Sequence, residues 1–372
     1  MISDMLFKIS RGVIIMASKR CLWRLSVLFL VGCLAGCSAI GPGTIARDRF
    51  DYTETVADSW KRQMLLNIVK IRYGDAPIFL DVASIINQYS VESTLNAAVG
   101  WSFPPNSNNQ QLGAAGRYYD RPTITYNLLT GEKFARSLMT PVSPGSVMSL
   151  VEGGYPIDLV FRILVHSVNG IRNQFGGSSR IRQADPEFFT LIEKMRQIQN
   201  SGAAAMRVKK LDGRDSLVMM FRQRTDPETE KMSKEVRRML GLKEEGGEFR
   251  VVYGSASTGD EEIALLTRSI LEILSDISST VEVPAEHVSE KRVNATMEPA
   301  GEGIRGNLIR IHAGKEKPAD GFTAVPYRDR WFWIDDRDYQ SKKLFSFLMF
   351  VMTLTETGGK QGEPVVTINA GG

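Results

Sequence analysis

The residues best suited to chemistry lie close together in the segment Tyr327–Asp338. Trp331 and Trp333 alternate with their neighbours, so on a β-strand both rings would lie on one face. Such a pair of rings could stack against a glycan, a peptide or a protein partner. Carboxylates that could hold a cation, or act as general acid and base, follow directly. The candidate binding residues are therefore Trp331, Trp333, Asp335, Asp336 and Asp338.

The same segment also fits a structural interpretation, which we favour over catalysis. A strand would pack its aromatic side chains on the core, and an aspartate would cap the helix that follows. The aspartates lack the order of a calcium-binding loop, so no metal site is assigned to them. The alternative is an enzyme that acts on a glycan or peptidoglycan through Asp335 and Asp338, which requires carboxyl groups about 5–9.5 Å apart.

Other catalytic signatures are missing from the sequence. The histidines are far apart and show no metal-binding spacing: His166, His287 and His312. Zinc-hydrolase, nucleophile-elbow and phosphate-loop motifs are missing as well. We therefore assign no catalytic residue and no cofactor, and we favour a protein that is not an enzyme.

The tetrapeptide Leu34-Ala35-Gly36-Cys37 resembles the lipobox of bacterial lipoproteins. A basic stretch, residues 19–24, and the apolar run Leu25–Leu34 precede it, which is the layout of a secretory signal. The run is too short to span a bilayer. The resemblance implies that residues 1–36 are removed and that Cys37 carries acyl chains such as palmitate. Those chains would suffice for stable membrane anchoring.

Three further expectations concern this N-terminal segment. The tetrapeptide Leu30-Val31-Gly32-Cys33 also fits the motif loosely, but it would shorten the apolar run below the usual 7–15 residues, so Cys37 is preferred. A second apolar patch precedes the basic stretch, and we therefore expect translation to begin at Met16. Ser38, rather than aspartate, follows the cysteine. This implies transport to the outer membrane.

The basic character of the chain belongs to the predicted signal. The whole sequence has 46 Lys and Arg against 42 Asp and Glu, a formal net charge of +4. Residues 1–36 alone hold five basic residues and one acidic residue, which leaves the mature chain neutral. Electrostatic steering of nucleic acid is therefore not supported. Cys37 is the only cysteine outside the signal, so no internal disulfide is expected.

Helices and strands are expected in mixed order beyond a lipidated tether at residues 37–51. Periodicity predicts helices at 52–73, 131–139, 146–152, 157–168, 186–199, 227–240, 258–278 and 339–355. Strands are predicted at 78–89, 91–103, 121–128, 206–211, 216–221, 249–253, 307–312, 322–327, 331–334 and 365–368. Polar segments at 104–116 and 169–185 are predicted to be loops. This order favours an α+β fold with small antiparallel sheets, as one large domain or as two regions, 52–201 and 202–372.

Three segments, residues 48–92, 169–173 and 331–343, look like those of an uncharacterised family of proteobacterial envelope lipoproteins. That resemblance implies a location but no activity. We predict a lipid-anchored protein of the Gram-negative outer membrane that faces the periplasm and acts as a non-enzymatic binding or scaffold protein. Its partner would be membrane lipid, together with an envelope protein or peptidoglycan. A ligand carrier with an apolar cavity is a third possibility.

Overall fold

The computed structural model describes residues 45–355, apart from 87–88, 101–108, 121–122, 130, 178–179, 212–213, 222–225, 246, 300 and 302. The predicted signal at 1–36, the lipidation residue Cys37 and the predicted strand at 365–368 lie outside the described residues. The chain divides into two compact units. One consists of Met1–Ala57 and Asp81–Asn127, and the other of Asp58–Leu80 and Leu128–Gly372.

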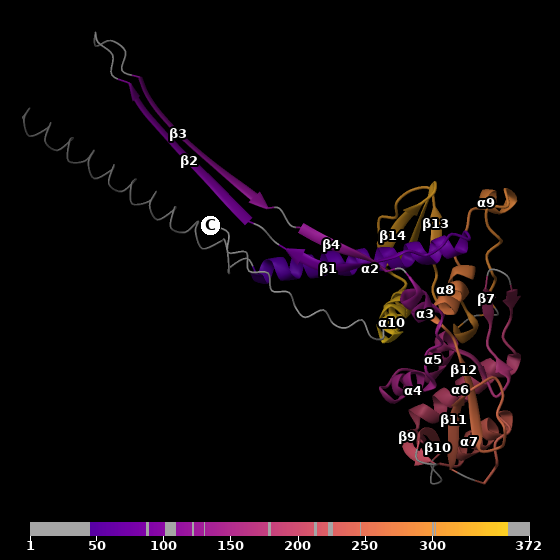
Figure 1. The fold of residues 1–372 in the computed structure, drawn as a ribbon. Coiled ribbons are helices and arrows are strands. Elements are labelled where there is room, and N and C mark those ends of the chain that lie inside the picture. Colours follow the sequence, from indigo (N-terminus) through magenta and orange to yellow (C-terminus); the bar gives the residue numbers. More distant parts are fainter. Residues whose placement is uncertain are drawn as a thin grey trace, which may run out of the picture. The chain divides into compact units, whose positions relative to one another are not determined.

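The smaller unit contains a long two-stranded antiparallel ribbon. Strand β2 (Tyr89–Gly100) pairs with β3 (Asn109–Asp120) along the full length of both strands (Figure 1). Most of β1 (Phe79–Ile86) also belongs to this unit, and it pairs with β4 (Thr123–Leu129). The predicted loop at 104–116 is therefore wrong for residues 109–116, while 104–108 lies outside the described residues. Pairing with β2 decides the conformation of this polar segment, because β-propensity depends on tertiary context.

The larger unit contains a six-stranded sheet in the order β6-β5-β12-β11-β10-β9. Its strands are β5 (Val165–Val168), β6 (Ile171–Arg172), β9 (Ala204–Leu211), β10 (Arg214–Phe221), β11 (Glu248–Tyr253) and β12 (Glu262–Thr267). All neighbours are antiparallel except β11 and β12. Since strands from both sides of residue 201 take part, the predicted regions 52–201 and 202–372 share this sheet.

Helices pack around the six-stranded sheet. The helix α4 contacts β9, β11 and β12, while α5, α6 and α7 pack against one another in series. Their bounds are α4 (Pro144–Glu152), α5 (Ile157–Leu164), α6 (Pro186–Asn200) and α7 (Pro227–Met239). Proline at the first turn of α4, α6 and α7 suits a helix start, since its missing N–H has no intrahelical partner there.

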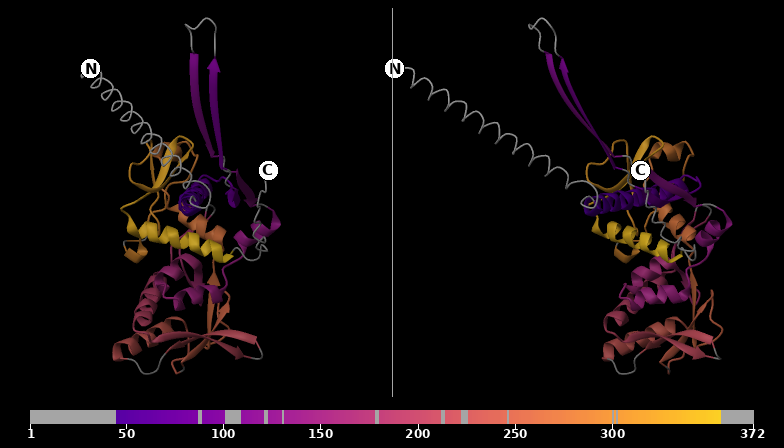
Figure 2. Two further views of the ribbon diagram at one scale, coloured as in Figure 1. Left: turned by 90° about the vertical axis from the view of Figure 1, so that its left-hand side faces the viewer. Right: turned by 60° about the vertical axis from the view of Figure 1, so that its left-hand side comes forward.

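A smaller antiparallel sheet lies elsewhere in the same unit, in the order β13-β15-β14. Helices α8 and α10 lie between the two sheets in Figures 1 and 2. The strands are β13 (His312–Gly314), β14 (Gly321–Tyr327) and β15 (Arg330–Asp335). The remaining elements are α2 (Ile45–Arg72), α3 (Glu132–Met139), α8 (Ile270–Ser279), α9 (Ala285–Ser289), α10 (Tyr339–Thr355), β7 (Phe175–Gly177), β8 (Arg180–Arg182) and a 3-10 turn, Gly303–Arg305.

This arrangement confirms the predicted α+β class. The closing helix at 339–355 was predicted as a buried core helix, and α10 has these bounds, with Phe345 and Leu348 fully buried. The predicted antiparallel pairing of β9 with β10 is present, while the predicted turn residues Asp212 and Gly213 lie outside the described residues. Among the described residues, no helix has both the length and the apolar character needed to cross a membrane.

The single helix predicted at 258–278 is wrong. Its first part forms β12, which lies between β5 and β11, and its second part forms α8. Ile263, Ala264 and Leu265 are all buried, so both faces of this strand are covered and it does not show the alternation of a half-exposed strand. Ser269 begins α8 through a capping box: its hydroxyl accepts the N–H of Glu272 at 3.3 Å, and the Glu272 carboxylate accepts the N–H of Ser269 at 2.8 Å.

Three other predictions differ from the structure in part. The helix predicted at 157–168 ends at Leu164 and continues as β5, and the loop predicted at 169–185 contains β6, β7 and β8. The strand predicted at 307–312 begins only at His312. The strand β5 pairs with β12 about a hundred residues later, whereas β6 pairs with β5 and β7 with β8 as short hairpins at the predicted loop. Local periodicity carries no information about the distant partner of β5, and strands of two to four residues are too short to show a period.

Glu262 holds the segment that connects the parallel strands β11 and β12 through hydrogen bonds. This residue opens β12, is 8% exposed, and accepts hydrogen bonds from the Thr258 hydroxyl and the Arg250 guanidinium. The Thr258 N–H also donates to it at 3.2 Å. The Thr258 hydroxyl, followed by Arg250 and the Thr258 N–H, lowers the pKa of Glu262 to about 2. Its folded-state pKa is therefore below the ordinary glutamate value of about 4.3.

We expect Glu262→Gln to remove a pH-dependent part of the stability. A depressed carboxylate pKa stabilises the fold above the unfolded-state pKa, and this contribution is lost as the pH falls toward 2. The difference in unfolding free energy between wild type and variant should therefore shrink from pH 7 to pH 3, as measured by urea denaturation. The exposed Glu245→Gln serves as control. A difference that stays constant over this range would contradict the assigned role.

Candidate functional site

The two tryptophans lie on the face of the small sheet opposite its buried face. Along β15, Phe332 and Ile334 are fully buried, whereas Trp331 and Trp333 are only partly buried. The alternation predicted from the sequence is therefore present, but the ring that fills the core is that of Phe332. The predicted packing of the two indoles on the core is wrong, and both rings remain partly open to solvent.

Small residues, a histidine and a lysine surround the two indole rings. The register places His312 and Ala324 beside Trp333, and Gly314 and Pro326 beside Trp331. We call these six residues, Trp331, Trp333, His312, Gly314, Ala324 and Pro326, the tryptophan face. The His312 and Trp333 ring centroids are 5.6 Å apart, and Lys317 Nζ lies 5.7 Å from the Trp331 ring centroid.

Gly314 lies flat against the Trp333 ring. A Cβ atom added to this glycine would come within 3.1 Å of the indole, closer than ordinary van der Waals contact. Glycine therefore lets the ring lie directly over the backbone of β13. On the β14 side, Ala324 and Pro326 have short side chains that do not rise above the indole rings. Such a surface, with two aromatic rings and short neighbouring side chains, is suited to a ligand that stacks on it and not to one that must be enclosed.

Each of the three candidate aspartates makes a hydrogen bond or an ion pair with a residue close to it in sequence. Asp338 caps α10: its carboxylate accepts the Ser341 N–H at 3.1 Å and the Ser341 hydroxyl at 2.7 Å. Asp335 accepts the N–H of Arg337 at 2.7 Å, which closes the turn after β15. Asp336 is paired with Lys342 Nζ at 2.7 Å. Asp338 thus has the capping role that the structural interpretation predicts.

The ionisation of Asp338 also disfavours a role as general acid. Burial by itself raises its pKa, but the two hydrogen bonds from Ser341 and the positive charges of Arg310 and His312 together lower the pKa below the ordinary aspartate value. A general acid that works near neutral pH needs a raised pKa. Asp338 is therefore suited to fixing the start of α10 and not to donating a proton.

A polar cleft of about 710 Å³ borders the tryptophan face. Residues 280–299, including α9, form one wall, and residues 307–315, including β13, form another. Gly314 belongs to both the cleft and the tryptophan face. The charged residues that line the cleft are Glu282, Glu286, Glu298, Arg310, Lys315 and Arg330. None of the three candidate aspartates lines it.

A hydroxyl, an imidazole and a carboxylate form a chain that sequence reasoning missed. Tyr73 Oη is hydrogen bonded to His287 Nδ1 at 2.7 Å, and His287 Nε2 lies 3.1 Å from Asp329 Oδ1 but without hydrogen-bond geometry. The order resembles an activated nucleophile. However, Tyr73 is 8% exposed and burial raises the pKa of its hydroxyl, so substrate access and activation are both disfavoured. Because 214 residues separate Tyr73 from His287, no local motif marks the contact.

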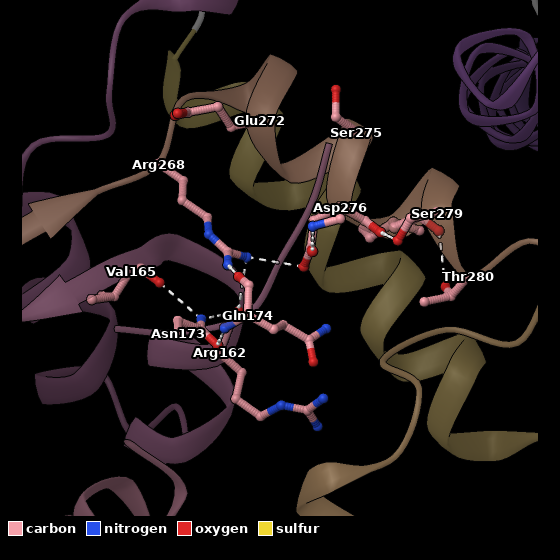
Figure 3. A network of polar contacts seen from close by, with 12 residues as sticks. Arg162, Val165, Asn173, Gln174, Arg268, Glu272, Ser275, Asp276, Ser279 and Thr280 are labelled. Carbon is pink, nitrogen blue, oxygen red and sulfur yellow. Dashed lines mark hydrogen bonds and ion pairs between the residues drawn. The ribbon is translucent and has the colours of Figure 1, made fainter. Parts of the chain in front are cut away.

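A second polar cluster surrounds Arg268, whose side chain is completely buried (Figure 3). Its guanidinium pairs with Asp276 at 3.0 Å and donates to the carbonyl of Gln174. The other Asp276 oxygen accepts the N–H of Gly176 at 2.7 Å. A Cβ atom on Gly176 would lie 2.0 Å from Ser279 Oγ, so only glycine fits there. With every group enclosed by the protein, this cluster organises the fold.

Asn173 extends the Arg268 cluster into the segment 169–173. Its side-chain amide donates to the carbonyls of Arg162 at 2.9 Å and Val165 at 2.8 Å, and its side-chain oxygen accepts the N–H of Gln174. Asn169, at the other end of the segment, accepts the N–H of Ala264 at 2.6 Å. Both asparagines therefore hold backbone in place.

Comparison of this chain with protein-family models, with curated proteins and with solved structures finds no significant match. Within the part of the chain that the structure describes, no group of three or more His, Cys, Asp or Glu side chains could hold a metal ion. The functional conclusion therefore depends on the surface chemistry of the larger unit.

We expect Asp338→Ala to destabilise the protein by about 1 kcal/mol, because it removes the N-cap of α10. The exposed ion pair of Asp336 contributes little, so Asp336→Ala should change stability by less than about 0.5 kcal/mol. Chemical denaturation of both variants checks this. Equal effects of the two substitutions would show that Asp338 does not act as a cap.

Proposed function

We propose that this protein is a non-enzymatic binding protein of the bacterial envelope, anchored in the outer membrane through acyl chains on Cys37 and facing the periplasm. Its ligand surface is the tryptophan face, and its ligand is an envelope glycan such as the saccharide strand of peptidoglycan. The single observation that carries this proposal is the position of Trp331 and Trp333, side by side on the outward face of the small sheet.

The chemistry of the tryptophan face supports a glycan ligand. Sugar rings present flat C–H surfaces, and indole rings offer a large apolar area with a negative face to stack against them. The neighbouring Lys317 ammonium and His312 imidazole can hydrogen bond to hydroxyl groups around a stacked sugar. The adjoining polar cleft, with carboxylates and cations on its walls, offers further partners to a branched polar ligand.

The alternative of a glycan-cleaving enzyme has less support. Asp335 and Asp338 accept hydrogen bonds from their own turn and helix, and neither lines the polar cleft. A general acid and base must both face the scissile bond of the bound glycan. The geometry therefore favours recognition over hydrolysis.

The membrane anchor can be tested with a matched pair of cysteine variants. We expect Cys37→Ala to abolish labelling by palmitate and to release the protein from the membrane fraction. Cys33→Ala should leave both unchanged, because Cys33 lies in the segment that is removed. Labelling and fractionation of cells that produce each variant provide the readout. The reverse pattern would move the lipidation site to Cys33, and labelling of both variants would show that Cys37 is not required for the anchor.

Binding by the tryptophan face can be tested by co-sedimentation with purified peptidoglycan. We expect Trp331→Ala and Trp333→Ala each to weaken binding roughly tenfold, equivalent to about 1.4 kcal/mol. Tyr339→Ala is a matched control, because Tyr339 is an exposed aromatic residue (71%) next to the small sheet but outside the tryptophan face. Circular dichroism verifies that each variant is folded. Unchanged binding by both folded tryptophan variants would refute the proposal.

A further inference from the structure

We propose that a second, apolar pocket in the larger unit binds a single unbranched hydrocarbon chain. The pocket lies between α4, α6 and the strands β9 and β10, and its volume is about 260 Å³. It shares no lining residue with the polar cleft and none with the tryptophan face. The inference is therefore independent of the proposed glycan site.

Most of the residues that line this pocket have apolar side chains, and Glu152 and Gln199 are the polar ones among them. Three methionines contribute thioether side chains, and Phe221 is the only aromatic residue among the lining residues. Methionine side chains are flexible and polarizable, so they adapt to a chain of variable shape. All three are nearly inaccessible to solvent from the protein surface: Met148 at 2%, Met195 at 4% and Met219 at 3% exposure.

Gln199, a partly buried polar residue in the pocket wall, already has its side-chain donors and acceptors in hydrogen bonds. Gln199 Nε2 donates to the carbonyls of Val151 at 3.2 Å and Tyr155 at 2.9 Å. Its Oε1 accepts the N–H of Ile157 at 3.0 Å and an Arg196 N–H at 2.8 Å. A primary amide has two donors and two acceptor positions, so none is left to hold a polar ligand or a water molecule.

The size of the pocket indicates one chain. An apolar cavity of about 150 Å³ stays dry and binds benzene, whereas pockets for drug-sized ligands begin at about 300 Å³. A pocket of 260 Å³ falls between these limits. Since Glu152 is exposed and is the only charged residue among the lining residues, a polar head group would remain at the entrance, outside the aliphatic walls.

The test uses the full chain with Cys37→Ala, so that no attached acyl chain competes, labelled with carbon-13 at the methionine methyl groups. The probe is n-decanol, whose neutral head group adds no charge. Saturable shifts are expected in the methyl signals of Met148, Met195 and Met219. Contacts between decanol methylene protons and these methyl groups should appear as intermolecular nuclear Overhauser effects.

Two other methionines report binding outside the pocket. Met297 lines the polar cleft and Met139 is exposed at the end of α3, so neither signal should move with the same saturation curve. Absence of shifts at the three pocket methyl groups would overturn the proposal. Parallel shifts at Met297 and Met139 would overturn it as well, because they would indicate non-specific adsorption.

A filling variant gives a second readout. Ala205 lines the pocket from β9, and Ala205→Leu should weaken decanol binding at least tenfold. Ala256→Leu, in an exposed loop, adds the same side chain elsewhere and should bind as wild type does. Unchanged binding by a folded Ala205→Leu protein would refute the site. If that variant does not fold, the Overhauser contacts in the unsubstituted pocket decide the question alone.

Discussion

The larger unit depends on a buried ion pair, Arg268 with Asp276. Arg268 is the residue that follows β12, and Asp276 lies on α8, so the pair clamps the end of a central strand to the helix that comes next. Removing two charges from water is costly, and attraction compensates for this only where hydrogen bonds satisfy the remaining groups. Here the carbonyl of Gln174 accepts a hydrogen bond from Arg268, and the N–H of Gly176 donates one to Asp276. The pair therefore determines where β7 lies against α8.

The two candidate binding surfaces result from how the core is filled. In the small sheet, Phe332 and Ile334 occupy the buried face beside α10, which leaves the indoles of Trp331 and Trp333 on the other face. Beside the six-stranded sheet, the side chains of α4 and α6 do not fill the space against β9 and β10, and the apolar pocket remains. One surface suits stacking against a polar ligand, and the other suits a hydrocarbon chain. Both uses are proposals that rest on side-chain chemistry and on geometry.

Much of the local structure could be predicted because its causes are local. Proline and glycine mark the ends of most helices, and the antiparallel pairing of β9 with β10 agrees with the hairpin predicted from their connection. The prediction was wrong where a partner distant in sequence decides the outcome. Residues 262–267 have a spacing that suits a helix, yet they form β12 because β5 and β11 supply its backbone partners. Residues 109–116 form a strand because β2 lies alongside them.

The candidate site shows the same division. The sequence alone determined that Trp331 and Trp333 share one face and that an aspartate caps the next helix, because both follow from spacing along one element. It also carries the lipobox-like motif that ends at Cys37. Only the tertiary structure decided which face of β15 is buried, since that depends on the packing of Phe332 against the core. It alone brought Tyr73 to His287 and enclosed Arg268 with Asp276, because these contacts join separate elements through packing that no local pattern encodes.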